Sequence, residues 1–238
     1  MTPYQHLRGY RFVTLRKTAE RRDAIHARAA GLDLKGTVLL AEEGINLSLG
    51  GRAAALHEFV AWLRSDPLFA ELQPHYGPAE ALPFRRLEVK CKREIIRMDC
   101  PAIRPGSGRA PALAPPKLAH WLAAGHDDAG RPLALLDTRN GFEVDAGRFE
   151  GALDWRLARF SDFPAALAAR RAELAGKTVV SYCTGGIRCE KAALLMREAG
   201  IDAWQLEGGI LGYFDAVGAR HFEGACFVFD ARETVAAR

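Results

Sequence analysis

The 238-residue chain has no long hydrophobic run. No apolar segment approaches the roughly 18 residues that a membrane-spanning helix requires. The N-terminal residues also show no apolar core of the kind that a secretory signal peptide needs. These absences argue against membrane association and predict a cytoplasmic location. Apolar residues make up 49% of the chain and charged residues 26%, which is typical of a globular protein large enough for two modest domains.

Cysteine is scarce and irregularly spaced. The five cysteines form no C-x-x-C pair, and their odd number leaves one over from any complete pairing. This spacing speaks against a disulfide framework and against a zinc site. The sequence also shows no flavin fingerprint, haem motif or two-His-one-carboxylate pattern, so it indicates no resident cofactor and no metal centre.

The segment 178–191 combines a buried strand, a glycine-containing loop that begins with Cys183, and the start of a helix with a periodic apolar face. Backbone N–H groups in such a loop can converge on one point, and the helix N-terminus adds a partial positive charge. A thiol there would be pushed towards the thiolate, with help from Arg188 if its side chain folds back over the loop. Gly185 and Gly186 allow positive φ and a close approach of a ligand to the main chain.

We therefore predict an active site at this loop rather than a plain turn behind a buried structural cysteine. Cys183 and Arg188 are the candidate catalytic residues. Cys189 is close enough in sequence to act as a resolving thiol, although packing at the start of the helix would explain it equally well. The loop residues expected to bind an anion or the substrate are Thr184, Gly185, Gly186, Ile187 and Cys189.

The loop 183–188, with the sequence Cys-Thr-Gly-Gly-Ile-Arg, resembles the C-x-x-G-x-R loop of rhodanese domains, in which the cysteine carries a persulfide. The upstream stretch 136–152 is similar to the D-x-R…E-x-x-x-G-H-(I/F)-x-G-A stretch of the same superfamily. The spacing argues against the related cysteine phosphatases, because their C-x5-R loop would place an arginine at position 189. The resemblance implies that three residues of this stretch support the reactive loop: Asp137, Arg139 and Glu143.

Three further segments narrow this resemblance to one subfamily. Leu206-Glu-Gly-Gly-Ile210, Cys226-Phe-Val-Phe-Asp230 and Ala41-Glu-Glu-Gly-Ile-Asn46 look like segments of the bacterial tRNA uridine(34) hydroxylases, so the resemblance covers nearly the whole chain. It implies oxygen-dependent formation of 5-hydroxyuridine at the wobble position of certain tRNAs, with molecular oxygen as co-substrate. Longer members of that family continue into a cysteine-rich tail, whereas this sequence ends at Arg238.

Periodicity divides the chain into two α/β domains. Residues 1–98 predict the order βαββαβ of a ferredoxin-like, acylphosphatase-like α+β domain, and residues 99–116, which hold five prolines, predict a linker. Residues 117–238 alternate helix and strand and predict a rhodanese-like, doubly wound parallel sheet with its ligand site at the carboxyl ends of the strands. The expected strands are 10–16, 37–41, 45–49, 85–98, 133–137 and 178–182, and the expected helices are 18–30, 52–64, 117–124 and 160–174.

Positive charge concentrates in the first domain. Residues 1–98 hold 16 Lys and Arg against 11 Asp and Glu, whereas residues 117–238 hold 15 against 17. A basic domain suits a partner that bears phosphates, and tRNA is the expected one, although a solvated strand face without a partner would explain the charge as well. The candidate tRNA-binding residues are Arg85, Arg86, Lys90, Lys92, Arg93 and Arg97.

Two other functions fit the same loop. A sulfurtransferase would use Cys183 to attack a sulfane donor and would hold the outer sulfur as a persulfide. A non-catalytic RNA-binding adaptor would use Cys183 and Cys189 only to sense oxidation. The sulfurtransferase is chemically the simpler enzyme, the family resemblance favours the hydroxylase, and the intact loop argues against the adaptor.

Overall fold

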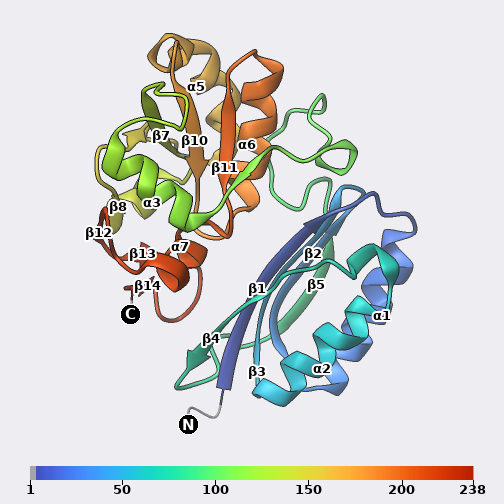
Figure 1. Cartoon of the computed structure of the whole chain (residues 1–238). Helices are drawn as coiled ribbons and strands as arrows, with labels where there is room; N and C mark the ends of the chain where they lie inside the picture. Colours follow the sequence, from blue (N-terminus) through green and yellow to red (C-terminus); the bar gives the residue numbers. More distant parts are fainter. Residues whose placement is uncertain (1–3, 238) are drawn as a thin grey trace. The chain divides into compact units, whose positions relative to one another are not determined.

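The computed structural model describes residues 4–237 and divides into two compact units (Figure 1). The first unit extends to Ile96 and also includes Asp230–Arg232, and the second holds Arg97–Phe229 and the segment from Glu233 onward. The assignment of 117–238 to one domain therefore overlooks three residues near the C-terminus. In the first unit, Arg8 donates to the Asp230 carboxylate at 2.6 Å, which fixes this returning segment. No helix within residues 4–237 is long and apolar enough to cross a membrane.

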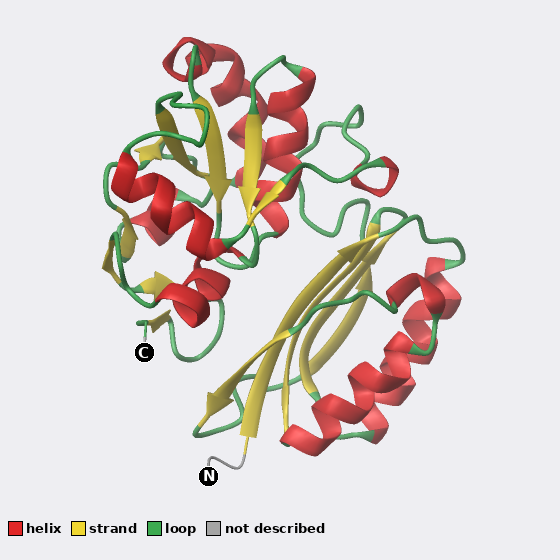
Figure 2. Ribbon diagram, in the orientation of Figure 1, coloured by secondary structure: helices red, strands yellow, loops and turns green. Residues whose placement is uncertain are grey.

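The first unit is a five-stranded sheet whose helices cover one face (Figure 2). Its elements are β1 (Tyr4–Phe12), α1 (Thr18–Gly31), β2 (Lys35–Ala41), β3 (Gly44–Gly51), α2 (Ala53–Arg64), η1 (Pro67–Phe69), β4 (His75–Ala79) and β5 (Leu87–Cys91). The strand order is β4-β1-β3-β2-β5, and the strands are antiparallel except for the parallel pair β2 and β5. Helix α1 packs on β2 and β5, and α2 packs on β1 and β3.

The ferredoxin-like fold is confirmed, but the prediction that residues 85–98 form its fourth strand is wrong. That strand is β4, whose Gly77 and Pro78 break the apolar alternation that would have revealed it. The strand predicted at 85–98 is the short β5, an additional edge strand beside β2. After β5, two side chains of the β2–β3 hairpin bind the backbone of Ile95. Glu43 accepts from the Ile95 N–H at 2.8 Å, and Asn46 donates to the Ile95 carbonyl at 3.1 Å.

The start of the first unit also differs from its prediction. Strand β1 ends at Phe12, so the predicted strand at 10–16 begins and ends too late. Thr18 is the first helical residue of α1, and Lys17 holds the cap position with a left-handed backbone. The hairpin of β2 and β3 and the amphipathic helix α2 are confirmed, and α2 buries the predicted apolar face of Leu56, Phe59, Val60 and Leu63.

The second unit contains a five-stranded parallel sheet with the order β6-β11-β10-β7-β9. Its strands are β6 (Ala112–Leu113), β7 (Leu133–Asp137), β8 (Gly147–Phe149), β9 (Leu153–Asp154), β10 (Thr178–Tyr182), β11 (Ala203–Leu206), β12 (Phe222–Gly224), β13 (Cys226–Phe227) and β14 (Thr234–Val235). Its helices are η2 (Pro105–Ser107), α3 (Pro115–Ala124), α4 (Gly141–Val144), η3 (Phe160–Asp162), α5 (Phe163–Arg170), η4 (Arg171–Leu174), α6 (Ile187–Glu198) and α7 (Gly209–Val217). The predicted parallel sheet is confirmed.

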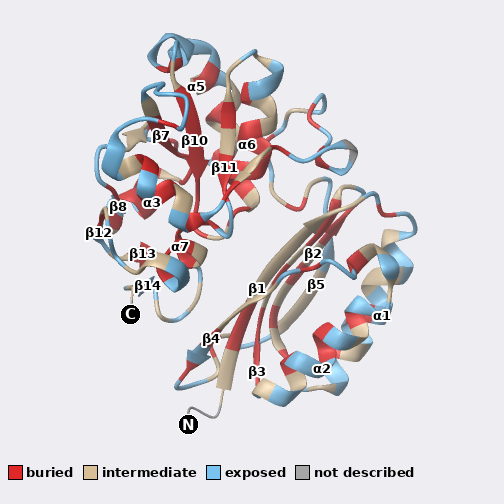
Figure 3. Ribbon diagram, in the orientation of Figure 1, coloured by how far each residue is buried: buried red, intermediate tan, exposed pale blue. Residues whose placement is uncertain are grey.

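The central strand β10 is buried along its whole length (Figure 3). Val180 and Tyr182 pack in one apolar cluster with residues of α3 and α7. Ser181, whose side chain points to the opposite face, donates to the Cys189 carbonyl of α6 at 3.2 Å. Helices therefore cover both faces of the sheet, as the doubly wound prediction requires.

Two element boundaries in the second unit correct the sequence analysis. Residues 112–116, which we assigned to the linker, form β6 and the first turn of α3, because β6 pairs with β11 at the sheet edge. The helix predicted at 160–174 is divided into η3, α5 and η4. The strands β7 and β10, which carry the loop, lie where they were predicted.

Candidate active site

The loop after β10 encloses the sulfur of Cys183, which has no exposed surface. The N–H of Gly186 donates to this sulfur at 3.1 Å, and the backbone N–H groups of Arg188 and Cys189 also bond to it. Gly186 has φ of 100°, a conformation that side chains rarely adopt, and it directly precedes α6. Gly185 does not have a positive φ, so only Gly186 needs the backbone freedom of glycine that we predicted for both residues.

The loop makes Cys183 an anion at neutral pH. Burial alone would raise the pKa of the thiol. The hydrogen bond from the Cys189 thiol, the positive charge of Arg188 and the two backbone N–H groups outweigh burial and lower the pKa of Cys183 to about 5. The predicted shift towards thiolate therefore agrees with the arrangement around the sulfur.

Cys189 lies in the first turn of α6 and is also fully buried. Burial, together with the neighbouring Cys183 thiolate, raises the pKa of Cys189 well above its usual range, so this residue keeps its proton. Its sulfur lies 3.1 Å from the Gly186 carbonyl, to which it can donate when it does not donate to Cys183. The structure thus brings the two cysteines together as a thiolate and a thiol.

Arg188 does not fold back onto the sulfur. Its guanidinium forms a bidentate pair with Glu143, at 2.5 Å to Oε1 and 2.8 Å to Oε2, and it also lies 3.5 Å from the Thr184 hydroxyl. Burial would lower the pKa of Arg188, but Glu143 raises it, so the guanidinium stays charged. The side chain of Arg188 therefore acts on Cys183 through its charge.

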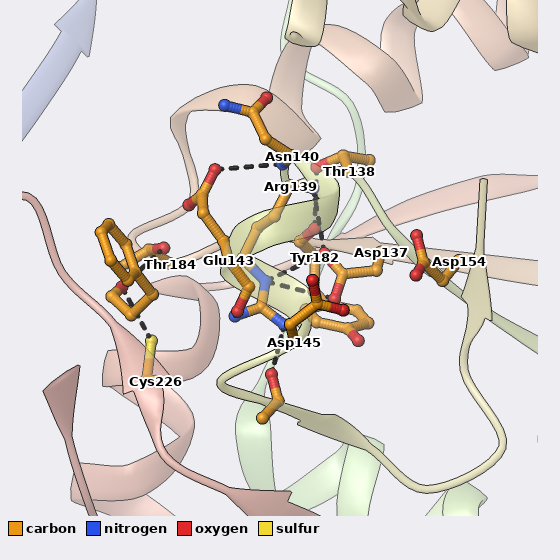
Figure 4. Close-up of polar contacts among 12 residues, drawn as sticks. Asp137, Thr138, Arg139, Asn140, Glu143, Asp145, Asp154, Tyr182, Thr184 and Cys226 are labelled. Atoms are coloured by element: carbon orange, nitrogen blue, oxygen red, sulfur yellow. Dashed lines mark hydrogen bonds and ion pairs between the residues drawn. The ribbon is translucent and has the colours of Figure 1, made fainter. Parts of the chain in front are cut away.

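The supporting residues Asp137 and Arg139 form a second buried ion pair at the carboxyl end of β7 (Figure 4). Arg139 donates to the Asp137 carboxylate at 2.6 Å, to the Gly147 carbonyl at 2.7 Å and to the Glu143 carbonyl at 3.3 Å. Glu143 in turn accepts from the Asn140 N–H at 3.0 Å. These bonds fix α4, and with it the carboxylate that holds Arg188.

Comparison with known proteins gives the same architecture and a family. A model of the UPF0176 acylphosphatase like domain matches residues 4–95, and a model of the rhodanese-like domain matches residues 118–216. A tRNA uridine(34) hydroxylase of Bordetella petrii is 58% identical over 95% of this chain and 90% of its own length. Proteins with that name from Variovorax paradoxus (57%, over 97% and 88%) and Delftia acidovorans (55%, over 100% and 90%) are similar to the same extent. The chain belongs to the tRNA uridine(34) hydroxylase family.

Two features that hold the loop of this hydroxylase family member escaped the sequence analysis. At the start of α7, the N–H of Ile210 donates to the Cys183 carbonyl at 2.9 Å. Gly209 permits this approach, because a Cβ there would lie 2.5 Å from the same carbonyl. On the other side, Thr138 donates to the Tyr182 carbonyl at 2.7 Å. The Gly-Gly pair of the 206–210 segment was a signal for the first feature, but we used it only as a family marker.

The structure does not place the candidate tRNA-binding residues on one strand, as we expected. Only Lys90 lies within β5; two of the residues precede it and three follow it. All six are exposed. Arg86 and Lys90 pair with Glu88 at 2.8 and 2.6 Å, and Arg97, which belongs to the second unit, pairs with Asp99 at 2.7 Å. Part of the positive charge is therefore balanced locally.

Within residues 4–237, no group of three or more His, Cys, Asp or Glu side chains is arranged to hold a metal ion. The ionised or reactive groups gathered at this loop of the hydroxylase family member are the Cys183 thiolate, the Cys189 thiol and the Arg188–Glu143 pair.

Replacing Cys189 with alanine should raise the pKa of Cys183, because the thiolate loses a hydrogen-bond donor. Cys189→Ser keeps a hydrogen-bond donor on a side chain of similar length. It should leave the pKa of Cys183 at about 5, as in the unchanged protein. The measurement is the rate of Cys183 alkylation against pH, quantified on the peptide that contains Cys183. An unchanged midpoint in Cys189→Ala would show that the Cys189 side chain does not stabilise the thiolate.

Proposed function

We propose that this protein hydroxylates uridine 34 of tRNA to 5-hydroxyuridine in the cytoplasm, with Cys183 as the reactive residue and molecular oxygen as co-substrate. Family membership supports the substrate and the reaction. The observation that carries the site is a buried thiolate at the centre of a loop whose N–H groups, Cys189 thiol and Arg188 charge hold it ionised. Such a thiolate is a nucleophile at neutral pH.

The reaction replaces hydrogen with hydroxyl at C5 of the uracil ring. A thiolate that adds to C6 of uracil leaves C5 electron-rich, so C5 can accept oxygen. One oxygen atom of O2 enters the base and the other leaves as water, while two thiols of an external reductant supply two electrons and two protons and become a disulfide. Loss of the C5 proton then expels the Cys183 thiolate from C6 and restores the double bond of the ring. Because Cys183 has no exposed surface, the loop must open locally before the ring can reach it.

The oxygen source provides the test. Cells that depend on this protein for 5-hydroxyuridine are grown under O2 enriched in oxygen-18, and the nucleosides of their tRNA are analysed by mass spectrometry. The proposal expects the heavy isotope in the hydroxyl group of 5-hydroxyuridine. Incorporation of oxygen-18 from labelled water instead would contradict O2 as co-substrate.

The burial of Cys183 favours one second candidate, a sulfurtransferase. The outer sulfur of a persulfide projects beyond the buried cysteine sulfur, and the same N–H groups can stabilise its charge. Mass spectrometry after incubation with thiosulfate distinguishes the two functions. Sulfur added to Cys183 and transferred to a thiol acceptor supports the second candidate; absence of added sulfur counts against it.

Binding of tRNA by the basic first unit is part of the proposal. Lys92 and Arg93 are exposed and follow β5, beyond the ion pairs around Glu88. Reversing both charges with Lys92→Glu and Arg93→Glu should weaken tRNA binding. It should also flatten the log–log salt dependence by about one unit for each phosphate that the variant no longer binds. The measurement is tRNA affinity across a series of salt concentrations.

The control makes the same change in net charge elsewhere in the first unit. Lys17 and Arg22 lie at α1, where each pairs with a carboxylate on the same helix. Their reversal to glutamate should leave the salt slope unchanged. Equal effects of the two double variants would mean that tRNA responds to overall charge, and the residues after β5 would then not bind its phosphates.

A further inference from the structure

We infer that Phe142, Phe227 and Phe229 form an aromatic platform that stacks the pyrimidine base of nucleotide 34 beside the Cys183 loop. This inference rests on the proposed function and adds to it the residues that position the base. The three rings come from two distant segments, α4 and the stretch that begins with β13, and all three belong to the second unit.

The platform is a compact cluster of rings. The ring centroids of Phe142 and Phe227 are 5.2 Å apart, those of Phe227 and Phe229 5.2 Å, and those of Phe142 and Phe229 6.3 Å, each pair edge to face. Phe142 is 51% exposed and Phe229 57%, and these are the two exposed large hydrophobic side chains of the described chain. Large apolar side chains gathered at one exposed point mark a surface that meets a ligand.

Two contacts and one neighbouring position in the sequence join the platform to the reactive loop. The Thr184 hydroxyl, in the residue after Cys183, lies 3.5 Å from the Phe227 carbonyl. The guanidinium of Arg188 lies over the Phe229 ring, 5.9 Å from its centroid. Phe142 directly precedes Glu143, the carboxylate that holds Arg188. A ring stacked here would lie next to the loop that contains the thiolate.

A nucleobase fits this surface better than a protein side chain does. Proteins that bind single-stranded nucleic acid stack bases on aromatic rings, often beside an arginine that adds a cation–π interaction. The anticodon loop presents nucleotide 34 unpaired, so its base is free to leave the stack and lie on a ring. The Arg188 charge at the edge of the platform can also attract the carbonyl oxygens of uracil.

The test compares leucine and tyrosine substitutions at the two exposed positions. Phe229→Leu and Phe142→Leu remove the ring but keep an apolar side chain, whereas Phe229→Tyr and Phe142→Tyr keep the ring. Affinity is measured for two versions of a substrate tRNA, one with uridine 34 and one with an abasic site at that position. We expect the unchanged protein and the tyrosine variants to prefer the uridine form about tenfold, and the leucine variants to lose that preference.

Kinetics and thiol chemistry separate this inference from its alternatives. The leucine variants should show a KM for tRNA raised about tenfold, while the pH dependence of Cys183 alkylation stays unchanged and shows that the loop is intact. Leucine variants with the unchanged preference and KM would overturn the platform and leave the hydroxylase proposal standing. Platform-dependent binding without 5-hydroxyuridine formation by the unchanged protein would overturn the hydroxylase and keep the platform. A change in self-association alone would make the cluster a protein–protein interface and overturn the inference.

Discussion

Cys183→Ser is expected to abolish 5-hydroxyuridine formation, by at least about a thousandfold, while leaving the fold intact. Serine is nearly isosteric with cysteine and can accept the same N–H bonds. The groups that lower the thiol pKa to about 5, however, cannot ionise a hydroxyl at neutral pH. The variant therefore keeps the anion-binding loop but has no nucleophile. The measurement is the initial rate of nucleoside conversion in substrate tRNA.

The matched control is Cys91→Ser, an exposed cysteine of the first unit. Its sulfur lies 3.4 Å from the Thr18 carbonyl, and a serine hydroxyl can donate there in its place. This variant should retain full activity. Full turnover by Cys183→Ser would remove Cys183 from the mechanism, whereas loss of activity in both variants would point to general damage by the substitution.

Asp137→Asn is expected to lower the free energy of unfolding of the second unit by about 3–5 kcal/mol. Asp137 and Arg139 have fully buried side chains, and the substitution leaves the Arg139 charge without its carboxylate in a site from which water is excluded. The Gly147 and Glu143 carbonyls still accept from Arg139, but they supply no compensating charge. Unfolding by urea, followed by tryptophan fluorescence, measures the change because three of the four tryptophans lie in the second unit.

The control for Asp137→Asn is another aspartate paired with an arginine in the same unit. Asp145 and Arg156 form a bidentate pair, but their side chains are 61% and 56% exposed. Water solvates both charges when the pair is broken, so Asp145→Asn should change stability far less. Equal decreases in the free energy of unfolding for Asp137→Asn and Asp145→Asn would contradict the view that burial of the ion pair makes Asp137 more important for stability.

The reactive loop was predictable because its parts are contiguous. A buried strand, a cysteine, two glycines and an amphipathic helix follow one another within 178–198, so local pattern alone places Cys183 at a strand end in front of a helix N-terminus. The direction of the Cys183 pKa shift follows from that placement. Residue periodicity likewise gave the parallel sheet and the amphipathic α2.

Long-range partners were not predictable in the same way. Arg188 pairs with Glu143, which lies 45 positions away, and no local pattern distinguishes that pairing from a guanidinium folded over the sulfur. Strand β4 was not predicted because glycine and proline interrupt its alternation of apolar and polar residues. The predicted strand at 85–98 is longer than β5 because the alternation of apolar and charged residues continues beyond Cys91. The return of Asp230 to the first unit includes an ion pair with Arg8, which lies 222 positions away in the sequence.

The two buried ion pairs explain how the carboxyl end of the sheet supports a buried anionic sulfur. Arg188 supplies the positive charge near Cys183, Glu143 keeps Arg188 in place, and Arg139 holds the backbone carbonyl of Glu143. A single unpaired arginine at that depth would be costly, and an arginine without a fixed partner would leave the thiol pKa poorly defined. The supporting residues therefore set the electrostatics of the loop as well as its shape.

The most direct test of the central claim is the appearance of 5-hydroxyuridine at position 34 in a bacterial strain whose own tRNA lacks it. The strain expresses either the unchanged chain or Cys183→Ser, and the wobble nucleosides are quantified by mass spectrometry. We expect 5-hydroxyuridine with the unchanged chain and none with the variant, at equal protein levels. Absence of 5-hydroxyuridine with the unchanged, folded protein, or equal amounts with both proteins, would contradict a Cys183-dependent tRNA hydroxylase.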